Sequence, residues 1–313
     1  MPSKPYLIRL SSRLNSGLVR MDGERRHRHR FFIQSQQQTD GGFSDREGDS
    51  DIYYTGFAIR GLSVLGGLRP DECESLGQFI QSYSKHQLNV VDLVSWLYST
   101  LAVQTFGGPE VFDDVKINWG DQLTSTLESV RTKDGGYAKT REGATGSTYH
   151  SFLVALTYEL IGRSVPNPNA LVQFIHDRQR DDGGFVEIEP MSHSGTNPTA
   201  AAVALLLMFD AMNEELRDDV HKFLQIIRSP EGGFKANARV PYADGLSTFT
   251  GLLTAHDLGI KTILDPANVE AFVTNKLELP AGGFRAASWD NQADVEYTFY
   301  GLGALGLLWT TDE

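Results

Sequence analysis

Three carboxylates stand at or just before segments that the sequence predicts to begin helices. Asp244 precedes the apolar stretch 245–253, and Asp294 and Glu296 precede the stretch 297–302. Carboxylate oxygens are the ligands that Mg²⁺ and Ca²⁺ prefer, so these residues are candidates for a divalent metal site. A charged residue in this position is more often a helix cap, because it accepts hydrogen bonds from the first backbone N–H groups. We therefore expect no tightly bound metal, with magnesium as the alternative.

The cysteine and histidine content limits other kinds of site. The chain has one cysteine, Cys73, which excludes an internal disulfide framework and a metal site built from several cysteines. The acidic neighbours Asp71, Glu72 and Glu74 are expected to raise the pKa of its thiol, which makes Cys73 a poor nucleophile. His150 lies in a predicted helix and is interpreted as a core or rim residue.

Charge is distributed unevenly along the 313 residues, whose net charge is −12. Residues 1–30 hold eight Lys and Arg against Asp22 and Glu24, so the remaining chain carries a net charge of −18. A body this acidic repels phosphate backbones, which argues against nucleic acid as a partner. Residues 1–31 are interpreted as a basic helical segment, because apolar residues recur there at helical spacing. No apolar run is long enough for a transmembrane segment, and we expect a cytoplasmic protein.

A Gly-Gly-aromatic triplet recurs along the chain, and its aromatic residues are spaced 94, 48, 49 and 50 residues apart. The triplets are Gly41-Gly42-Phe43, Gly135-Gly136-Tyr137, Gly183-Gly184-Phe185, Gly232-Gly233-Phe234 and Gly282-Gly283-Phe284. The first gap is two periods of 47, so one copy near residue 90 lacks the triplet. The spacing predicts six units in a single repeat domain over residues 1–313, although the length alone would suggest about two domains.

Every unit has the same predicted order, in which an amphipathic helix, the glycine turn, a polar loop and a more apolar helix follow one another. No unit can bury its apolar helix alone, so neighbouring units must stack. The last apolar helix, 298–309, has almost no chain after it that could cover it. This favours a closed ring over an open solenoid. The sequence therefore predicts an all-α fold, an α/α toroid of about six helical hairpins.

Aromatic residues gather at or near the predicted starts of the apolar helices. Each of them alone would be read as a core residue. Their recurrence from unit to unit indicates that they wall an apolar cavity, a central funnel lined by the inner helices. The residues are Tyr53, Tyr54, Trp96, Tyr149, Phe249, Tyr297, Phe299 and Tyr300.

Six predicted helical hairpins, five of them marked by a Gly-Gly-Phe-type turn, resemble the β subunits of protein prenyltransferases and the terpene cyclases with squalene-cyclase-type repeats. In repeat organisation the chain is most similar to the β subunit of type II geranylgeranyltransferase. The resemblance extends from about Phe32 to Trp309 and is specific for the fold. It says much less about chemistry. It also implies a helical α-subunit-like protein partner.

The resemblance implies a zinc site that this sequence does not keep. In the prenyltransferase β subunits, zinc is held by an Asp-x-Cys motif and by a histidine at the start of the sixth inner helix. Asp244 matches the aspartate, but Leu246 replaces the cysteine and Tyr297 replaces the histidine. Leucine cannot bind a metal, and neutral tyrosine is a poor ligand, so zinc is not expected. Asp244, Tyr297 and Glu296 remain the candidate catalytic residues.

The resemblance also implies an isoprenoid diphosphate site, which is partly kept. The segment Ser192-His193-Ser194-Gly195 matches the family's histidine that contacts the diphosphate. Lys235 and Arg239 lie in the fifth-unit loop, where the family has two cations, although neither is cleanly in register. We expect the diphosphate to face His193 and Arg239, since such a group needs several positive donors. The isoprenoid tail is expected to contact Tyr149, Phe249, Tyr297 and Tyr300.

The cyclase side of the resemblance implies a different catalyst. A class II cyclase protonates an alkene with the middle residue of an Asp-x-Asp-Asp motif. The helix start Asp294-Val295-Glu296-Tyr297 lacks that acid pair. Glu296 could replace the acid, but the sequence shows no partner that would hold it protonated and aimed.

We therefore interpret the chain as a prenyltransferase β-subunit-like protein that binds an isoprenoid diphosphate or another lipid and that could transfer the prenyl group. Two alternatives stay open. One is a terpene-cyclase-like enzyme with an unusual acid. The other is a non-catalytic toroid that binds a lipid or a protein partner.

Overall fold

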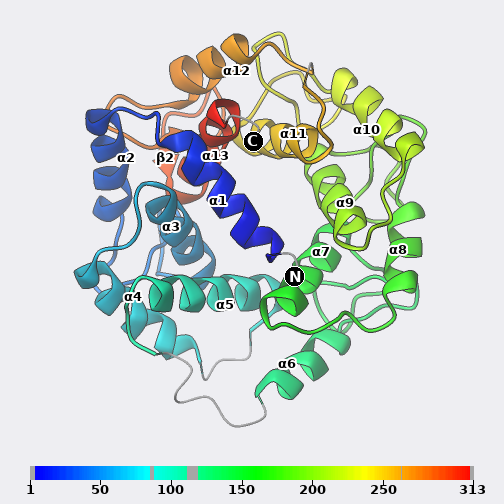
Figure 1. Cartoon of the computed structure of the whole chain (residues 1–313), viewed down its shortest axis with the longest axis horizontal. Helices are drawn as coiled ribbons and strands as arrows, with labels where there is room; N and C mark the ends of the chain where they lie inside the picture. The colour runs from blue at the N-terminus through cyan, green and yellow to red at the C-terminus, as the bar shows by residue number, and fades with distance from the viewer. Residues whose placement is uncertain (1–3, 85–87, 111–118, 262, 311–313) are drawn as a thin grey trace. The chain divides into compact units, whose positions relative to one another are not determined.

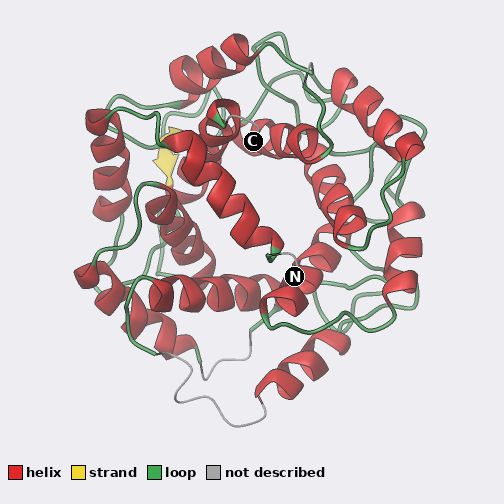
Figure 2. Ribbon diagram, in the orientation of Figure 1, coloured by secondary structure: helices red, strands yellow, loops and turns green. Residues whose placement is uncertain are grey.

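The computed structural model describes residues 4–84, 88–110, 119–261 and 263–310, and these form two compact units. The first unit consists of residues 1–123 and 278–313, and the second of residues 124–277. Helices make up nearly all of the regular structure, as Figures 1 and 2 show. The two named strands, β1 (Phe284–Arg285) and β2 (Ala293–Asp294), form one short antiparallel pair.

The first unit joins both ends of the chain. Its helices are α1 (Tyr6–Leu18), α2 (Gly23–Ser35), α3 (Ile52–Val64), α4 (Pro70–Tyr83), α5 (Val90–Thr105) and α13 (Val295–Trp309). The N-terminal helix α1 and the helix α3 both pack against the C-terminal helix α13. At the crossing of α1 and α13, a Cβ added to Gly17 would lie 1.9 Å from the carbonyl oxygen of Gly306. The basic N-terminal segment is therefore two helices, and α1 is packed in the unit.

The second unit repeats one helical arrangement. Its helices are α7 (Thr148–Leu160), α8 (Pro168–His176), α9 (Thr196–Met208), α10 (Glu214–Ile226), α11 (Gly245–Asp257) and α12 (Pro266–Phe272), which continues into the π-helical turn η2 (Val273–Leu277). The helix α6 (Trp119–Glu128) begins in the first unit and ends in the second. The helix α9 lies between α7 and α11 and contacts both.

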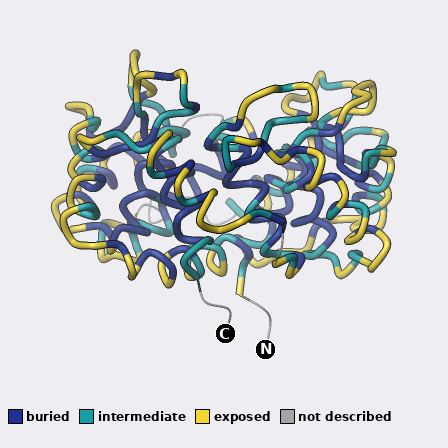
Figure 3. The backbone as a smooth tube through the Cα atoms, turned by 90° about the horizontal axis from the view of Figure 1, so that it is seen from above, coloured by how far each residue is buried: buried dark blue, intermediate teal, exposed yellow. Residues whose placement is uncertain are grey.

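Two kinds of helix alternate along the chain, as the sequence predicts. The helix α10 buries Leu216, Val220, Phe223 and Leu224, which share one face, while its acidic face is exposed. The following helix, α11, is buried over most of its length. Buried backbone runs through the interior, and exposed stretches lie at loops and edges (Figure 3). In the described part of the chain, an amphipathic helix is followed by an apolar helix six times. The pair α4–α5 is the one without a glycine triplet.

The glycine triplets have one structural role in all five copies. The first glycine has a positive φ of between 86° and 107° and lies against a backbone carbonyl of another helix, for example that of Asp219 for Gly183. The second glycine lies against a phenylalanine ring, which is Phe223 for Gly184. The aromatic residue is buried, and its N–H donates to a hydroxyl of the next apolar helix, as Phe185 does to Thr199 at 2.9 Å. Glycine is required because a side chain would collide with these neighbours.

No helix in the described part of the chain is both long enough and apolar enough to cross a membrane.

Candidate functional site

Glu296 lies in the first turn of α13, where its side chain is partly buried. Its Oε1 atom accepts hydrogen bonds from the hydroxyl of Tyr53 at 2.7 Å and from the hydroxyl of Tyr300 at 3.1 Å. Both hydrogen bonds are made to the same oxygen, Oε1. The two oxygens of this carboxyl group therefore have different environments, and Oε2 is the one left to hold a proton.

Six aromatic side chains of α3 and α13 contact one another in the first unit, and two of them, Tyr53 and Tyr300, hydrogen-bond to this carboxyl group. We call the six the aromatic cluster: Tyr53, Tyr54, Phe57, Tyr297, Phe299 and Tyr300. The ring of Phe57 lies at its centre, 5.0 Å from the ring of Tyr53 and 5.3 Å from that of Tyr300. Phe57, Phe299 and Tyr300 are buried, while the other three are partly exposed. The accessible face of the cluster is therefore tyrosine-rich, with an apolar layer behind it.

Burial raises the pKa of Glu296, while the hydrogen bonds from Tyr53 and Tyr300 act in the opposite direction. Burial likewise raises the pKa of the Tyr54 hydroxyl, helped by the nearby Asp45 and Glu296 carboxylates. The cluster therefore favours the neutral forms of both groups.

A network of ion pairs around Arg46 holds the start of α13 in place. Asp294 is the N-cap of α13 and accepts a hydrogen bond from the N–H of Tyr297 at 2.7 Å. Its other oxygen accepts from Arg46, whose guanidinium also forms two hydrogen bonds with the Asp290 carboxylate, at 3.0 and 2.5 Å. Burial is the largest single effect and would raise the pKa of Asp290, but Arg46 and the backbone N–H groups of Gln292 and Ala286 together outweigh it and lower that pKa. Arg46 thus links the loop before α3 to the loop before α13.

Asp244 acts as a helix cap in the second unit. One of its oxygens accepts from the N–H of Ser247 and the other from the Ser247 hydroxyl, both at 2.7 Å. Burial raises the pKa of Asp244. Both oxygens are engaged, and Leu246 offers no ligand atom, so the residues here do not fit zinc. Within the described residues, no group of three or more His, Cys, Asp and Glu is placed to hold a metal ion.

We expect the purified protein, dialysed after exposure to zinc, to retain less than about one tenth of a zinc ion per chain, because a tight site needs about four ligands. Inductively coupled plasma mass spectrometry measures the ratio. Asp244→Ala is the matched control. Stoichiometric zinc in the wild type that this variant loses would contradict the expectation.

The cationic residues predicted to face a diphosphate lie in two loops of the second unit that contact each other. His193 is exposed in the loop before α9. Lys235 and the exposed Arg239 lie in the loop before α11. The first residue of α9, Thr196, joins the loops, because its N–H donates to the carbonyl of Ala236 at 2.9 Å and its hydroxyl to that of Lys235 at 2.5 Å. The structure therefore brings the two predicted loops together.

The four residues predicted to contact an isoprenoid tail divide between the units. Tyr297 and Tyr300 belong to the aromatic cluster, and their ring centroids lie 5.9 Å apart. Tyr149 lies at the start of α7, and Phe249 is buried in α11.

Two features escaped the sequence analysis. The hydroxyl groups of Tyr53 and Tyr300 are the partners that Glu296 was expected to lack. Tyr300 follows Glu296 by four residues, so helical spacing could have revealed that contact, but Tyr53 comes from the other end of the chain.

Cys73 agrees with expectation, because burial, and then Glu72 and Asp71, raise the pKa of its thiol.

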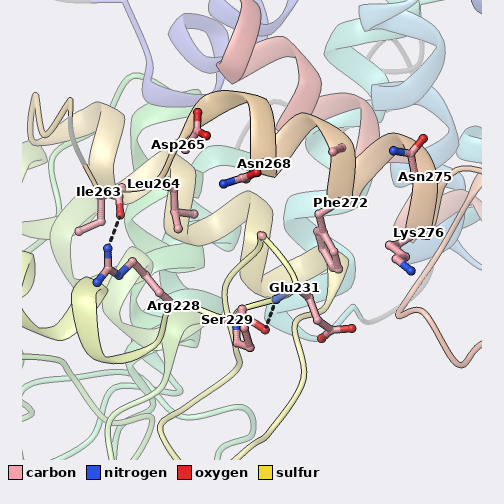
Figure 4. A pocket seen from close by; sticks show the side chains of 13 residues that line it. Arg228, Ser229, Glu231, Ile263, Leu264, Asp265, Asn268, Phe272, Asn275 and Lys276 are labelled. Atoms are coloured by element: carbon pink, nitrogen blue, oxygen red, sulfur yellow. Dashed lines mark hydrogen bonds between the residues drawn. The ribbon is translucent and has the colours of Figure 1, made fainter.

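A cavity of about 660 Å³ opens in the second unit beside α12 and η2 (Figure 4). The turn around Ser229 and Glu231 forms its other side. Arg228 and Lys276 line it, and the Arg228 guanidinium donates to the carbonyl of Ile263 at 3.4 Å. Gly232 of the fourth glycine triplet lines this cavity, but none of the candidate catalytic or substrate-binding residues predicted from the sequence does.

Comparison with known proteins places the fold of this chain among the α/α toroids. A family model described as the prenyltransferase alpha-alpha toroid domain matches residues 19–94 and 252–312. Protein geranylgeranyltransferase-I from Candida albicans, solved in complex with GGPP, is similar in structure with a TM-score of 0.72 and 17% identity, over 90% of each chain. A comparison with curated proteins gives no match.

Two further solved structures share the fold. A variant of the type II terpene cyclase MstE from Scytonema, in complex with its substrate geranylgeranyl dihydroxybenzoate, has a TM-score of 0.61 and 14% identity, over 97% of each chain. An inactive variant of an α-1,6-mannanase from Salegentibacter has a TM-score of 0.59 and 13% identity, over 91% of this chain and 98% of that one. The predicted all-α toroid is confirmed. Because the mannanase shares the fold, the fold alone does not select a chemistry.

Proposed function

We propose that this chain, an α/α toroid with the fold of prenyltransferases and type II terpene cyclases, binds an isoprenoid compound against its aromatic cluster and uses Glu296 as the acid. The similar solved structures bind GGPP and geranylgeranyl dihydroxybenzoate, which suggests the geranylgeranyl chain as the hydrocarbon. The zinc ligands of a prenyltransferase do not fit here, and this favours proton chemistry over zinc-thiolate chemistry.

The hydrogen bonding of Glu296 carries the proposal. Burial raises the pKa of Glu296 and so favours the protonated carboxyl group that an acid needs before reaction. The hydroxyls of Tyr53 and Tyr300 both donate to Oε1 and stabilise the carboxylate that remains after the proton has left. A proton on Oε2 is therefore both held and releasable, as a general acid requires.

The proposed step is protonation of a carbon–carbon double bond of the ligand. The Oε2–H bond breaks, and the alkene electron pair forms a new C–H bond, which leaves a tertiary carbocation and the Glu296 carboxylate. The faces of aromatic rings stabilise cations, and the accessible rings of the cluster are those of Tyr53, Tyr54 and Tyr297. The Glu296 carboxylate then takes a proton from a carbon next to the cation, which gives an isomerised or cyclised product and restores the acid.

The test is incubation of the metal-free protein with geranylgeraniol and with geranylgeranyl diphosphate, followed by gas chromatography and mass spectrometry after phosphatase treatment. We expect a new hydrocarbon skeleton with the mass of the starting alcohol. Failure of both compounds to bind or to react would contradict the proposal. A co-purified lipid, identified by mass spectrometry, would name the natural ligand.

A second candidate function is diphosphate binding in the second unit. It is favoured by the contact between the loops of His193 and Arg239 through Thr196. A histidine and an arginine donate charge-assisted hydrogen bonds to phosphate oxygens, and Lys235 adds a third cation. A helical α-subunit-like partner remains a prediction of the resemblance.

We expect His193→Ala to weaken binding of geranylgeranyl diphosphate by about 1–3 kcal/mol, the usual effect of losing a charge-assisted hydrogen bond. Isothermal titration calorimetry measures the affinity. His27→Ala is the control, since His27 is exposed on α2, outside both loops. An affinity that is unchanged in His193→Ala would remove the diphosphate site from the proposal.

A further inference from the structure

A hydrogen-bonded chain of three side chains lies in the second unit at the start of α7. Ser147, the N-cap of α7, has its hydroxyl 2.7 Å from Nδ1 of His150 and in contact with Oε1 of Glu187. The hydroxyl also accepts from the N–H of His150, and Glu187 accepts from the N–H of Tyr149 at 3.3 Å. The order is thus carboxyl, hydroxyl, imidazole.

The far end of this chain is an unpaired ring nitrogen. Nε2 of His150 is buried and has no hydrogen-bond partner among the described residues. A buried polar atom without a partner costs free energy, so Nε2 needs a hydrogen-bond donor from water or from a ligand. The ring of Tyr149 stands edge-on to the imidazole, with the centroids 6.0 Å apart.

The serine hydroxyl can pass a proton between its two neighbours. With Glu187 ionised, Ser147 donates to Glu187, the imidazole donates from Nδ1 to Ser147, and Nε2 carries a lone pair. A proton arriving at Nε2 lets Nδ1 give its own proton to Ser147, while Ser147 gives its proton to Glu187. The imidazole is then again neutral, and the carboxylate has become a carboxylic acid.

We infer that Ser147, His150 and Glu187 form a proton-accepting site, at which Nε2 of His150 takes a proton from a hydroxyl group of a ligand and Glu187 receives it through Ser147. The ligand class is an alcohol or a phenol, which supplies the hydrogen-bond donor that Nε2 lacks. The ligand's O–H bond breaks, its electron pair stays on the oxygen, and a neutral carboxylic acid replaces a partly buried carboxylate.

The charged groups around the site agree with this direction of transfer. Burial lowers the pKa of His150, and the positive charge of Lys139 adds to that effect, so imidazolium is disfavoured. Burial raises the pKa of Glu187, against the opposing hydrogen bonds from Ser147 and Tyr149. Both shifts favour movement of a proton from the imidazole toward Glu187. The site is independent of Glu296 and of the proposed isoprenoid chemistry.

Nitrogen-15 NMR of histidine-labelled protein tests the proton relay, with the His150 signals assigned from their loss in His150→Phe. On lowering the pH from about 8 to about 5, we expect the proton to move from Nδ1 to Nε2 while the ring stays neutral. Glu187→Gln and Ser147→Ala should abolish this movement of the proton from Nδ1 to Nε2. Ser147→Thr keeps both the helix cap and the hydroxyl group, so this variant should retain the proton movement. An imidazolium in the wild type, or an unchanged tautomer, would overturn the relay.

Phenol and its methyl ether, anisole, test the ligand class, because they share a shape and differ in the donor. We expect the wild type to bind phenol about fivefold more tightly, the effect of one ordinary hydrogen bond of about 1 kcal/mol. His150→Phe should lose that preference. Equal affinity of the wild type for both probes, read from the His150 shifts, would overturn hydroxyl recognition even if the relay exists.

Discussion

Glu296→Gln is expected to lower the turnover of an isoprenoid substrate by at least about 100-fold, the usual effect of removing a general acid. The amide oxygen of glutamine can still accept the hydrogen bonds from Tyr53 and Tyr300, but no acidic proton remains. The fold should be retained. Burial raises the pKa of Glu296 and so already disfavours its charged form, and the neutral amide of the variant suits the same surroundings. Product formation, followed by gas chromatography, measures the turnover.

The pH profile separates an acid from a merely structural carboxyl group. Activity requires the protonated carboxyl, so it should fall as the pH rises through the pKa of Glu296. Tyr53→Phe removes a hydrogen bond that lowers this pKa, and the fall should therefore move to higher pH. Glu296→Gln should show no such limb in its residual activity. Wild-type turnover in Glu296→Gln, or a profile unchanged by Tyr53→Phe, would contradict the assigned role.

The repeat could be predicted from the sequence because its cause is local. Each glycine turn packs against a helix of the same compact unit. The turn requires a first glycine with a positive φ and a second glycine that lies against a ring, so the same residues recur at each copy. The alternation of amphipathic and apolar helices is likewise visible in hydrophobic spacing. The unit that lacks the triplet, between α4 and α5, was located by the doubled gap alone.

The chemistry of the site was harder to predict because it depends on contacts between distant residues. Tyr53 and Glu296 are 243 residues apart and meet because α3 packs against α13. Ser147 and Glu187 are separated by 40 residues, and nothing in either segment marks the contact. Sequence reasoning identified Glu296 as a candidate but interpreted His150 as a core or rim residue, and the partners of both came from packing. Asp244 is different, because its contacts are local. The sequence indicated that it could cap a helix, and its hydrogen bonds from Ser247 are those of a helix cap.

Gly183→Ala is expected to destabilise the protein by about 3 kcal/mol or more, through two separate effects. The φ of Gly183 is 86°, a left-handed conformation that costs a residue with a Cβ about 1–2 kcal/mol. The added Cβ would also lie 2.1 Å from the carbonyl oxygen of Asp219 in α10, a backbone atom that cannot turn aside. Relief of that overlap requires the turn and α10 to separate, which opens the packing of Gly184 on Phe223.

Gly162→Ala isolates the conformational part of this effect. Gly162 has a φ of 68°, and a Cβ there would meet nothing within 4 Å, so this variant should lose about 1–2 kcal/mol. Both glycines belong to the second unit, so the two variants can be compared in the same urea transition. We expect the midpoint of Gly183→Ala to lie clearly below that of Gly162→Ala. Equal midpoints would mean that the close approach of the glycine turn to α10 does not stabilise the repeat, and that the glycine is required for its φ alone.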